Sequence, residues 1–329
     1  MKVLFIGGTG NISTSVSRLA VERGIDLYLL HRNKATERIE GATSLIGDIN
    51  DTATVERLLA SHRFDCVVDW IAFNPSDVER DIALFSEKTA QYIFIGTASS
   101  YQKPPLHPII TESTPLRNPF WDYSHNKILC EKRLEQAYRD RGFPMTVVRP
   151  SLTYDTHFPI AIGGWGGYTI ADRMLKGRPI IVHGDGTSLW TVTHASDFAK
   201  GFVGLLGRQQ VVGQAFHITS DELLTWNQIY ETIARALGTT ASIVHIPSDF
   251  IATVAPEVGA GLLGDKAHSA IFDNTKIKTF VPDYVATVPF ESGIEQTIRF
   301  FDEHPERKII NPDVNRVMDE ILRAWGHSL

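Results

Sequence analysis

A tyrosine and a lysine placed one helical turn apart offer the clearest acid–base chemistry in this sequence. Tyr123 and Lys127 stand at the start of an amphipathic stretch, residues 127–139, so a helix would carry both side chains on one face. A phenol with its usual pKa of about 10 is no base at neutral pH, and lowering that pKa to about 7 takes roughly 4 kcal/mol. One ammonium about 5 Å away supplies roughly 3 kcal/mol at an effective dielectric near 20. We therefore expect Lys127, helped by a second positive charge, to make Tyr123 a proton shuttle.

The N-terminal segment predicts a binding site for a pyrophosphate. An apolar run, residues 3–6, leads into glycines at positions 7, 8 and 10, and an amphipathic stretch begins at Ile12. This order is typical of a buried strand, a tight turn and a helix N-terminus, whose free amides and positive dipole end attract phosphate. Gly7 and Gly10 match the dinucleotide fingerprint, whereas Ser13 takes the place of its third glycine. That glycine serves packing, so we expect binding to be retained; the alternative is an ordinary strand–helix turn without a nucleotide.

The first half of the sequence alternates strand-like and helix-like patterns. The strand-like segments are residues 3–6, 27–30, 44–46, 66–71, 92–95 and 145–149. The helix-like segments include residues 12–23, 53–61, 78–86 and 127–139. Such alternation predicts an α/β, Rossmann-like fold with a doubly wound parallel sheet and right-handed crossovers. We assign residues 1–150 to a dinucleotide-binding domain.

The alternation fades after Pro150. Residues 151–329 are predicted to form a smaller, mostly helical substrate-binding part, from which segments near 197–218 return to the sheet. A glycine-rich run at residues 163–167 is interpreted either as a mobile lid over a ligand or as a plain surface loop.

Composition excludes several classes of protein. The 329 residues are 43% hydrophobic, enough for a large core, and the net charge of −6 disfavours nonspecific nucleic-acid binding. Two cysteines provide neither a disulfide framework nor a metal cluster and suit a reducing cytoplasm. No apolar run approaches the roughly 18 residues that span a bilayer. We expect a cytoplasmic protein with no metal, although His194 and Asp197 have a spacing that metal ligands on a helix also show.

Taken in order, these motifs resemble those of the extended short-chain dehydrogenases/reductases, the group that contains nucleotide-sugar epimerases and dehydratases. The matching segments are the glycine-rich turn, Gly47 with Asp48, residues 65–72, residues 95–101, the Tyr123 and Lys127 pair, residues 148–151 and residues 184–197. The resemblance implies that Tyr123 moves a proton while a hydride moves between a substrate carbon and NAD or NADP. It also implies that Lys127 holds the nicotinamide ribose and that Thr97, or in second place Ser99, orients the substrate oxygen.

The resemblance further implies a set of contacts to cofactor and substrate. The cofactor set is Gly7, Gly10, Asn11, Ile12, His31, Arg32, Asp48, Ile49, Ala72, Tyr123, Lys127 and Pro150. His31 and Arg32 stand where NAD enzymes usually carry an acid, which favours NADP unless the pair is merely a solvated strand end. Ser99, Phe73 and Trp190 are the candidate substrate contacts, with core packing as the alternative for Phe73.

Trp190 makes a nucleotide-sugar substrate doubtful. It occupies the place where nucleotide-sugar enzymes carry an arginine for the diphosphate, and an aromatic ring offers no charge-assisted hydrogen bonds. Either Arg173, Lys176 or Arg178 compensates, or the substrate is smaller, more apolar or a sugar without a nucleotide. The function implied is an NAD(P)-dependent epimerase or oxidoreductase acting at a secondary alcohol or ketone of a sugar-like small molecule, in a homodimer. The alternative is a non-catalytic, NAD(P)-binding regulatory or RNA-binding protein on the same fold.

Overall fold

A seven-stranded, all-parallel sheet forms the centre of the N-terminal half in the computed structural model, which describes residues 1–32, 38–163 and 166–327. Its order is β12-β7-β5-β4-β1-β2-β3. The strands are β1 (Lys2–Ile6), β2 (Asp26–His31), β3 (Thr43–Ile46), β4 (Cys66–Asp69), β5 (Tyr92–Ile95), β7 (Met145–Pro150) and β12 (Ala215–Ile218). The chain runs outward from β1 to β3 and then from β4 to β12 on the other side. The switch point between β1 and β4 is where ligands bind in such sheets.

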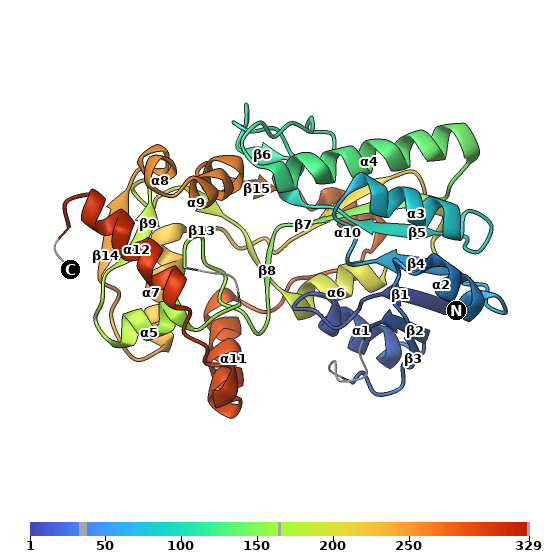
Figure 1. Ribbon diagram of the computed structural model, residues 1–329, viewed down its shortest axis with the longest axis horizontal. Helices are drawn as coiled ribbons and strands as arrows, with labels where there is room; N and C mark the ends of the chain where they lie inside the picture. Colours follow the sequence, from blue (N-terminus) through green and yellow to red (C-terminus); the bar gives the residue numbers. More distant parts are fainter. Residues whose placement is uncertain (33–37, 164–165, 328–329) are drawn as a thin grey trace.

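Helices cover both faces of this sheet (Figure 1). On one face lie α1 (Ser13–Glu22) and α6 (Ala195–Val203), whose apolar side chains share one core cluster with β1 and β2. On the other face lie α2 (Thr52–Leu59), α3 (Pro75–Phe85) and α4 (Asp122–Arg141), which share a second cluster with β4 and β5. The predicted doubly wound α/β fold is confirmed.

The C-terminal part combines helices with short strand pairs around its own core. Its helices are α5 (Thr169–Leu175), α7 (Trp226–Ala236), α8 (Ser248–Val254), α9 (Pro256–Gly261), α10 (Thr275–Phe280), α11 (Phe290–Glu303) and α12 (Pro312–Ala324), with a π-helical turn at Leu262–Lys266. Single turns of 3-10 helix lie at Ala98–Ser100, Gln209–Val211 and Pro305–Arg307. The strand pairs are β8 (Leu152–Tyr154) with β11 (Val192–His194), β9 (Ile180–His183) with β14 (Ile243–Ile246), β10 (Leu189–Trp190) with β13 (Leu224–Thr225), and β6 (Ile109–Ile110) with β15 (Ile271–Phe272).

Two element boundaries differ from the predicted ones. β4 ends at Asp69, because the Asp69 carboxylate accepts hydrogen bonds from the amides of Ile71 and Ala72 and turns the chain. α4 begins at Asp122, so Tyr123 lies inside the helix. Residues 164 and 165 of the glycine-rich run lie outside the described residues, so the lid interpretation stays a prediction. Among the described residues we find no helix with the length and apolarity needed to cross a bilayer.

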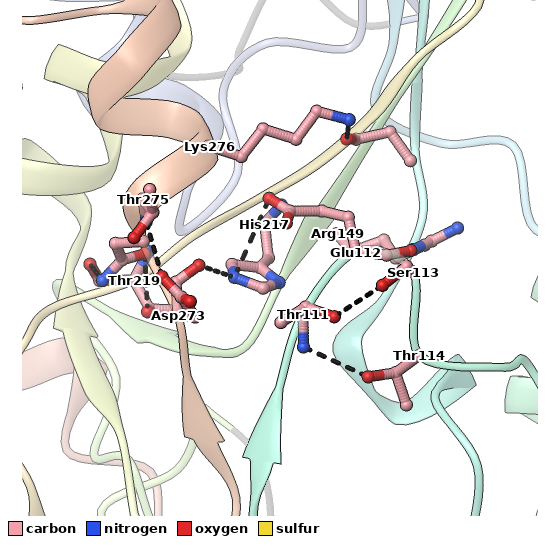
Figure 2. A network of polar contacts seen from close by, with 12 residues as sticks. Thr111, Glu112, Ser113, Thr114, Arg149, His217, Thr219, Asp273, Thr275 and Lys276 are labelled. Atoms are coloured by element: carbon pink, nitrogen blue, oxygen red, sulfur yellow. Dashed lines mark hydrogen bonds and ion pairs between the residues drawn. The ribbon is translucent and has the colours of Figure 1, made fainter.

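A buried polar network fixes β12 against the segments around β6 and β15 (Figure 2). His217 on β12 places Nε2 2.8 Å from the carbonyl oxygen of Asp273, and its amide donates to the Glu112 carboxylate at 3.3 Å. Lys276 Nζ donates to the β12 carbonyl of Ala215 at 2.9 Å. Burial lowers the pKa of His217, so the ring is neutral at neutral pH. We interpret this network as structural support for the end of the sheet.

Candidate active site

The glycine-rich turn between β1 and α1 lies at the switch point of the sheet. Gly7 and Gly8 have φ angles of 91° and 103°, and a Cβ on Gly8 would stand 2.8 Å from a methyl of Leu29. The Gly10 amide donates to Ser13 Oγ at 2.8 Å, so the residue at the third glycine position braces the turn. The amides of Asn11 and Ile12 donate to no described residue. These two amides at the start of α1 are therefore available to a phosphate.

Lys127 is buried beneath the ends of β4 and β5. Its Nζ donates to the carbonyl oxygens of Ala72 at 2.7 Å and Ile95 at 2.8 Å. Burial lowers the pKa of the Lys127 ammonium to about 8, while nearby groups including Asp69 act in the opposite direction. The two carbonyls fix the position of the ammonium, and the Asp69 carboxylate in turn fixes the loop that supplies one of them.

The structure brings Tyr123 and Lys127 together. Lys127 Nζ lies 5.9 Å from the centroid of the Tyr123 ring, and that ring also lies 4.8 Å from the Trp121 ring and 6.4 Å from the Phe73 ring. The lowered phenol pKa expected from Lys127 together with a bound cofactor stays a prediction, and in the protein alone the shift has the opposite direction. Burial raises the pKa of Tyr123 to about 12, and a hydrogen bond with Thr97 opposes this only in part. Desolvation of the phenolate outweighs the stabilisation that the chain itself supplies.

Three hydroxyls form a chain beside the phenol. Thr97 Oγ1 lies 2.9 Å from Ser99 Oγ, which lies 2.6 Å from Ser124 Oγ. Thr97 and Ser99 both line the adjoining cavity. Sequence reasoning named Thr97 and Ser99 but missed Ser124, although it follows Tyr123 directly in the chain.

A cavity of about 570 Å³ opens between the two halves of the chain next to these groups. Ile12, Thr97, Tyr123 and Pro150 contribute to its wall, as predicted site residues from the N-terminal half. Ser151 also lines it, and its Oγ is buried without a hydrogen-bond partner among the described residues. A buried hydroxyl without a partner costs stability unless a ligand satisfies it. Sequence reasoning gave Ser151 no role, although it lies in a quoted motif.

The groups predicted to contact the adenosine end lie at the C-terminal ends of β2 and β3. His31 Nε2 stands 3.2 Å from Ser44 Oγ, and Arg32 is exposed. Asp48 accepts a hydrogen bond from the Asn50 amide at 3.0 Å, whereas the Ile49 side chain is buried in the core. The chain continues from Arg32 into residues 33–37, outside the described part, so recognition of a 2′-phosphate by this pair stays a prediction.

The two aromatic candidates for substrate contact have different surroundings. Phe73 is 46% exposed and its ring centroid lies 4.5 Å from Lys127 Nζ, so it borders the candidate catalytic groups. Trp190 is 2% exposed, stacks at a tilt on Trp226 with ring centroids 5.5 Å apart, and does not line the cavity. The predicted substrate contact of Trp190 is therefore corrected: pairing of β10 with β13 carries its indole into the C-terminal core.

His194 and Asp197 make structural contacts at the start of α6. His194 Nδ1 accepts from the Ser196 amide as a helix cap, and Asp197 accepts from the amides of Thr287 and Val288. Within the described ranges, no three potential ligand side chains gather as a metal site would require.

Comparison with known proteins connects this geometry to a family. Residues 3–219 match the sequence profile described as the NAD dependent epimerase/dehydratase family. The chain is 23% identical over 291 residues to a 2'-dehydrokanamycin reductase of Streptomyces kanamyceticus, covering 86% of this chain and 80% of the relative. It is 26% identical over 265 residues to the chloroplast stem-loop binding protein of 41 kDa b of Arabidopsis thaliana, covering 76% and 67%. A dTDP-glucose 4,6-dehydratase from Bacillus anthracis, solved in complex with NAD, superposes with a TM-score of 0.72 at 17% identity, covering 93% of this chain and 98% of that one.

Proposed function

The chain belongs to the NAD dependent epimerase/dehydratase family, and from that premise we propose that it reduces a ketone of a sugar-like small molecule with NADPH or NADH. The observation that carries this proposal is the group of Tyr123, Lys127 and Thr97 beside a cavity that also reaches Ile12 at the glycine-rich turn. An acid, a fixed ammonium and a hydroxyl next to a phosphate-binding turn are the parts that carbonyl reduction needs.

The residues present fit a nicotinamide dinucleotide. The free amides of Asn11 and Ile12 would hold its pyrophosphate, and Lys127 would hold the nicotinamide ribose. The buried, unpartnered Ser151 Oγ would satisfy a polar group of the ring substituent. When bound, this cofactor supplies the hydride.

The chain's own contribution to the reaction is the proton. Since burial raises the pKa of Tyr123 to about 12, the phenol carries its proton at neutral pH and can donate it to the carbonyl oxygen of the substrate. Thr97 would donate a hydrogen bond to the same oxygen as negative charge develops there. The carbonyl thus gains a hydride at carbon and a proton at oxygen, and Tyr123 regains its proton from solvent.

One observation favours reduction over epimerisation: the Streptomyces relative is named as a reductase. Epimerisation remains the second candidate, because many proteins of similar fold are named as epimerases. An RNA-binding role, suggested by the name of the Arabidopsis relative, receives less support from a chain with net charge −6 and both Tyr123 and Lys127 in place.

Cofactor release distinguishes the two catalytic candidates. Purified protein is denatured and its supernatant is read near 260 nm, and near 340 nm before and after enzymatic reduction, so that oxidised and reduced dinucleotide are both counted. A panel of keto sugars is then tested for oxidation of NADPH and NADH. A reductase exchanges its cofactor, so we expect little retained dinucleotide and steady oxidation with a suitable ketone. A stoichiometric amount of retained dinucleotide with no net oxidation would favour the epimerase.

A further inference from the structure

The charged groups on the wall of the cavity are few. Among its described lining residues the charged ones are Glu257, Asp265 and Lys266. Lys266 Nζ donates to Asp265 Oδ2 at 3.0 Å and stands 5.5 Å from the centroid of the Trp121 ring. Lys103 is buried near this pair but does not line the cavity. Glu257, in the first turn of α9, is exposed and makes no ion pair with a described residue, so it presents an unpaired carboxylate to the cavity.

The three cations that the sequence offers for a diphosphate are bound elsewhere. Arg173 is fully buried and donates to Asp319 at 2.8 Å and to the carbonyl of Pro179. Arg178 donates to Asp319 at 2.7 Å, and Lys176 pairs with Asp172 at 2.7 Å. None of the three lines the cavity. None of these three residues therefore replaces the missing arginine as a partner for a diphosphate in the cavity.

These charges select against one class of substrate. A diphosphate brings two negative charges, which proteins hold with arginine, lysine or clusters of amides because uncompensated buried charge is costly. This cavity would offer it a lysine already paired with a carboxylate and a second, free carboxylate. The remaining wall, with Leu152, Ile160 and Val258, suits the C–H faces of a ring.

Building on the proposed function, we propose that the substrate is a cyclic polyol or glycoside without a diphosphate, preferred when it carries an ammonium group, and that Glu257 is the residue that sets this preference. The carboxylate attracts the ammonium group across the cavity. Because Glu257 is exposed, the attraction is of the size of a surface ion pair and weakens as salt rises.

A matched pair of ligands tests the proposal on the full chain saturated with oxidised cofactor. Methyl glucosaminide carries an amino group where methyl glucoside carries a hydroxyl. UDP-glucose adds the diphosphate. Their affinities are measured by calorimetry at slightly acidic pH, where the amine is charged. We expect the glucosaminide to bind about two- to five-fold more tightly than the glucoside at low salt, with a smaller ratio at high salt, and UDP-glucose to bind more weakly than either.

The variants Glu257→Gln and Glu257→Lys test whether Glu257 causes the preference for the ligand with the ammonium group. We expect the affinity ratio to fall to about one in the first and below one in the second, whereas Glu56→Gln, an exposed carboxylate on α2, keeps the original ratio. Circular dichroism verifies the fold of each variant. An affinity ratio of glucosaminide to glucoside near one in the wild type overturns the proposal. So does the absence of binding of both glycosides, or tighter binding of UDP-glucose. Those results leave ketone reduction standing; failure to bind or oxidise NADPH and NADH refutes the proposed function instead.

Discussion

The two walls of the cavity are built differently. The wall from the N-terminal half stands at the ends of parallel strands, where Lys127 is held by two carbonyls and Thr97 joins a chain of three hydroxyls. The facing wall comes from α9 and the π-helical turn, and it carries Val258, the Asp265–Lys266 pair and the unpaired Glu257. From this difference we infer that the sheet positions the groups that carry out the reaction. The short helical segments of the C-terminal part, α9 and the π-helical turn, determine which substrate binds.

Removing the phenol hydroxyl, on the wall from the N-terminal half, gives the largest predicted effect, a loss of catalytic rate. Tyr123→Phe deletes the proton donor and keeps the ring, so we expect kcat to fall by about 10³-fold. NAD(P)H affinity, measured by fluorescence titration, should change by less than about two-fold, because the substitution leaves the proposed cofactor contacts, Lys127 and the turn amides, intact. Unimpaired turnover of this variant would remove Tyr123 from the mechanism.

Replacing the buried ammonium changes how stability depends on pH. The folded protein holds Lys127 at a pKa of about 8 against 10.5 for the free side chain, so between these values the unfolded chain binds more protons. The free energy of unfolding of the wild type should therefore rise with pH, relative to Lys127→Met, by about 2–3 kcal/mol across that window. Urea melts of both proteins without cofactor measure it; parallel pH profiles would show that the ammonium is solvated.

The hydroxyl next to the phenol is the third test. Thr97→Val keeps the shape and removes the hydrogen bond to the substrate oxygen, so we expect kcat to fall by about 10²-fold. Thr97→Ser should recover most of the rate, and Ser99→Ala should cost less than Thr97→Val. A larger loss from Ser99→Ala would assign the orienting role to Ser99.

A core substitution on the substrate side gives the smallest predicted effect on catalysis. Trp190→Phe leaves space around Trp226 and should lower the free energy of unfolding by about 1–2 kcal/mol. KM for a ketone substrate should stay within about two-fold, because the indole lies in the core. A large rise in KM without loss of stability would return Trp190 to the substrate site.

Local patterns in the sequence were enough to predict the sheet and the proximity of Tyr123 and Lys127. Hydrophobic periodicity identified the strands around β1 and β4, and helical spacing placed Lys127 next to Tyr123. The sequence patterns did not predict contacts between residues that lie far apart in the chain. Trp190 is buried against Trp226, and Arg173 is hydrogen-bonded to Asp319, which lies far along the chain.

The pKa of Tyr123 shows the same limit. The prediction of a lowered pKa counted the charges of Lys127 and a bound cofactor and left out the desolvation by the folded chain, which raises the pKa of the phenol in the protein alone. Burial is a property of the assembled fold, so spacing in the sequence gave no measure of it.

Titration of the Tyr123 phenol with and without oxidised cofactor tests the central claim most directly. Ionisation is followed by ultraviolet difference absorbance, and subtraction of the Tyr123→Phe curve isolates this phenol from the other tyrosines. The account predicts a pKa near 12 for the protein alone and a decrease of about 2–3 units with NADP⁺ or NAD⁺, since one positive charge a few ångströms away supplies about that much. An unchanged curve under saturating cofactor would contradict the placement of a nicotinamide beside Tyr123.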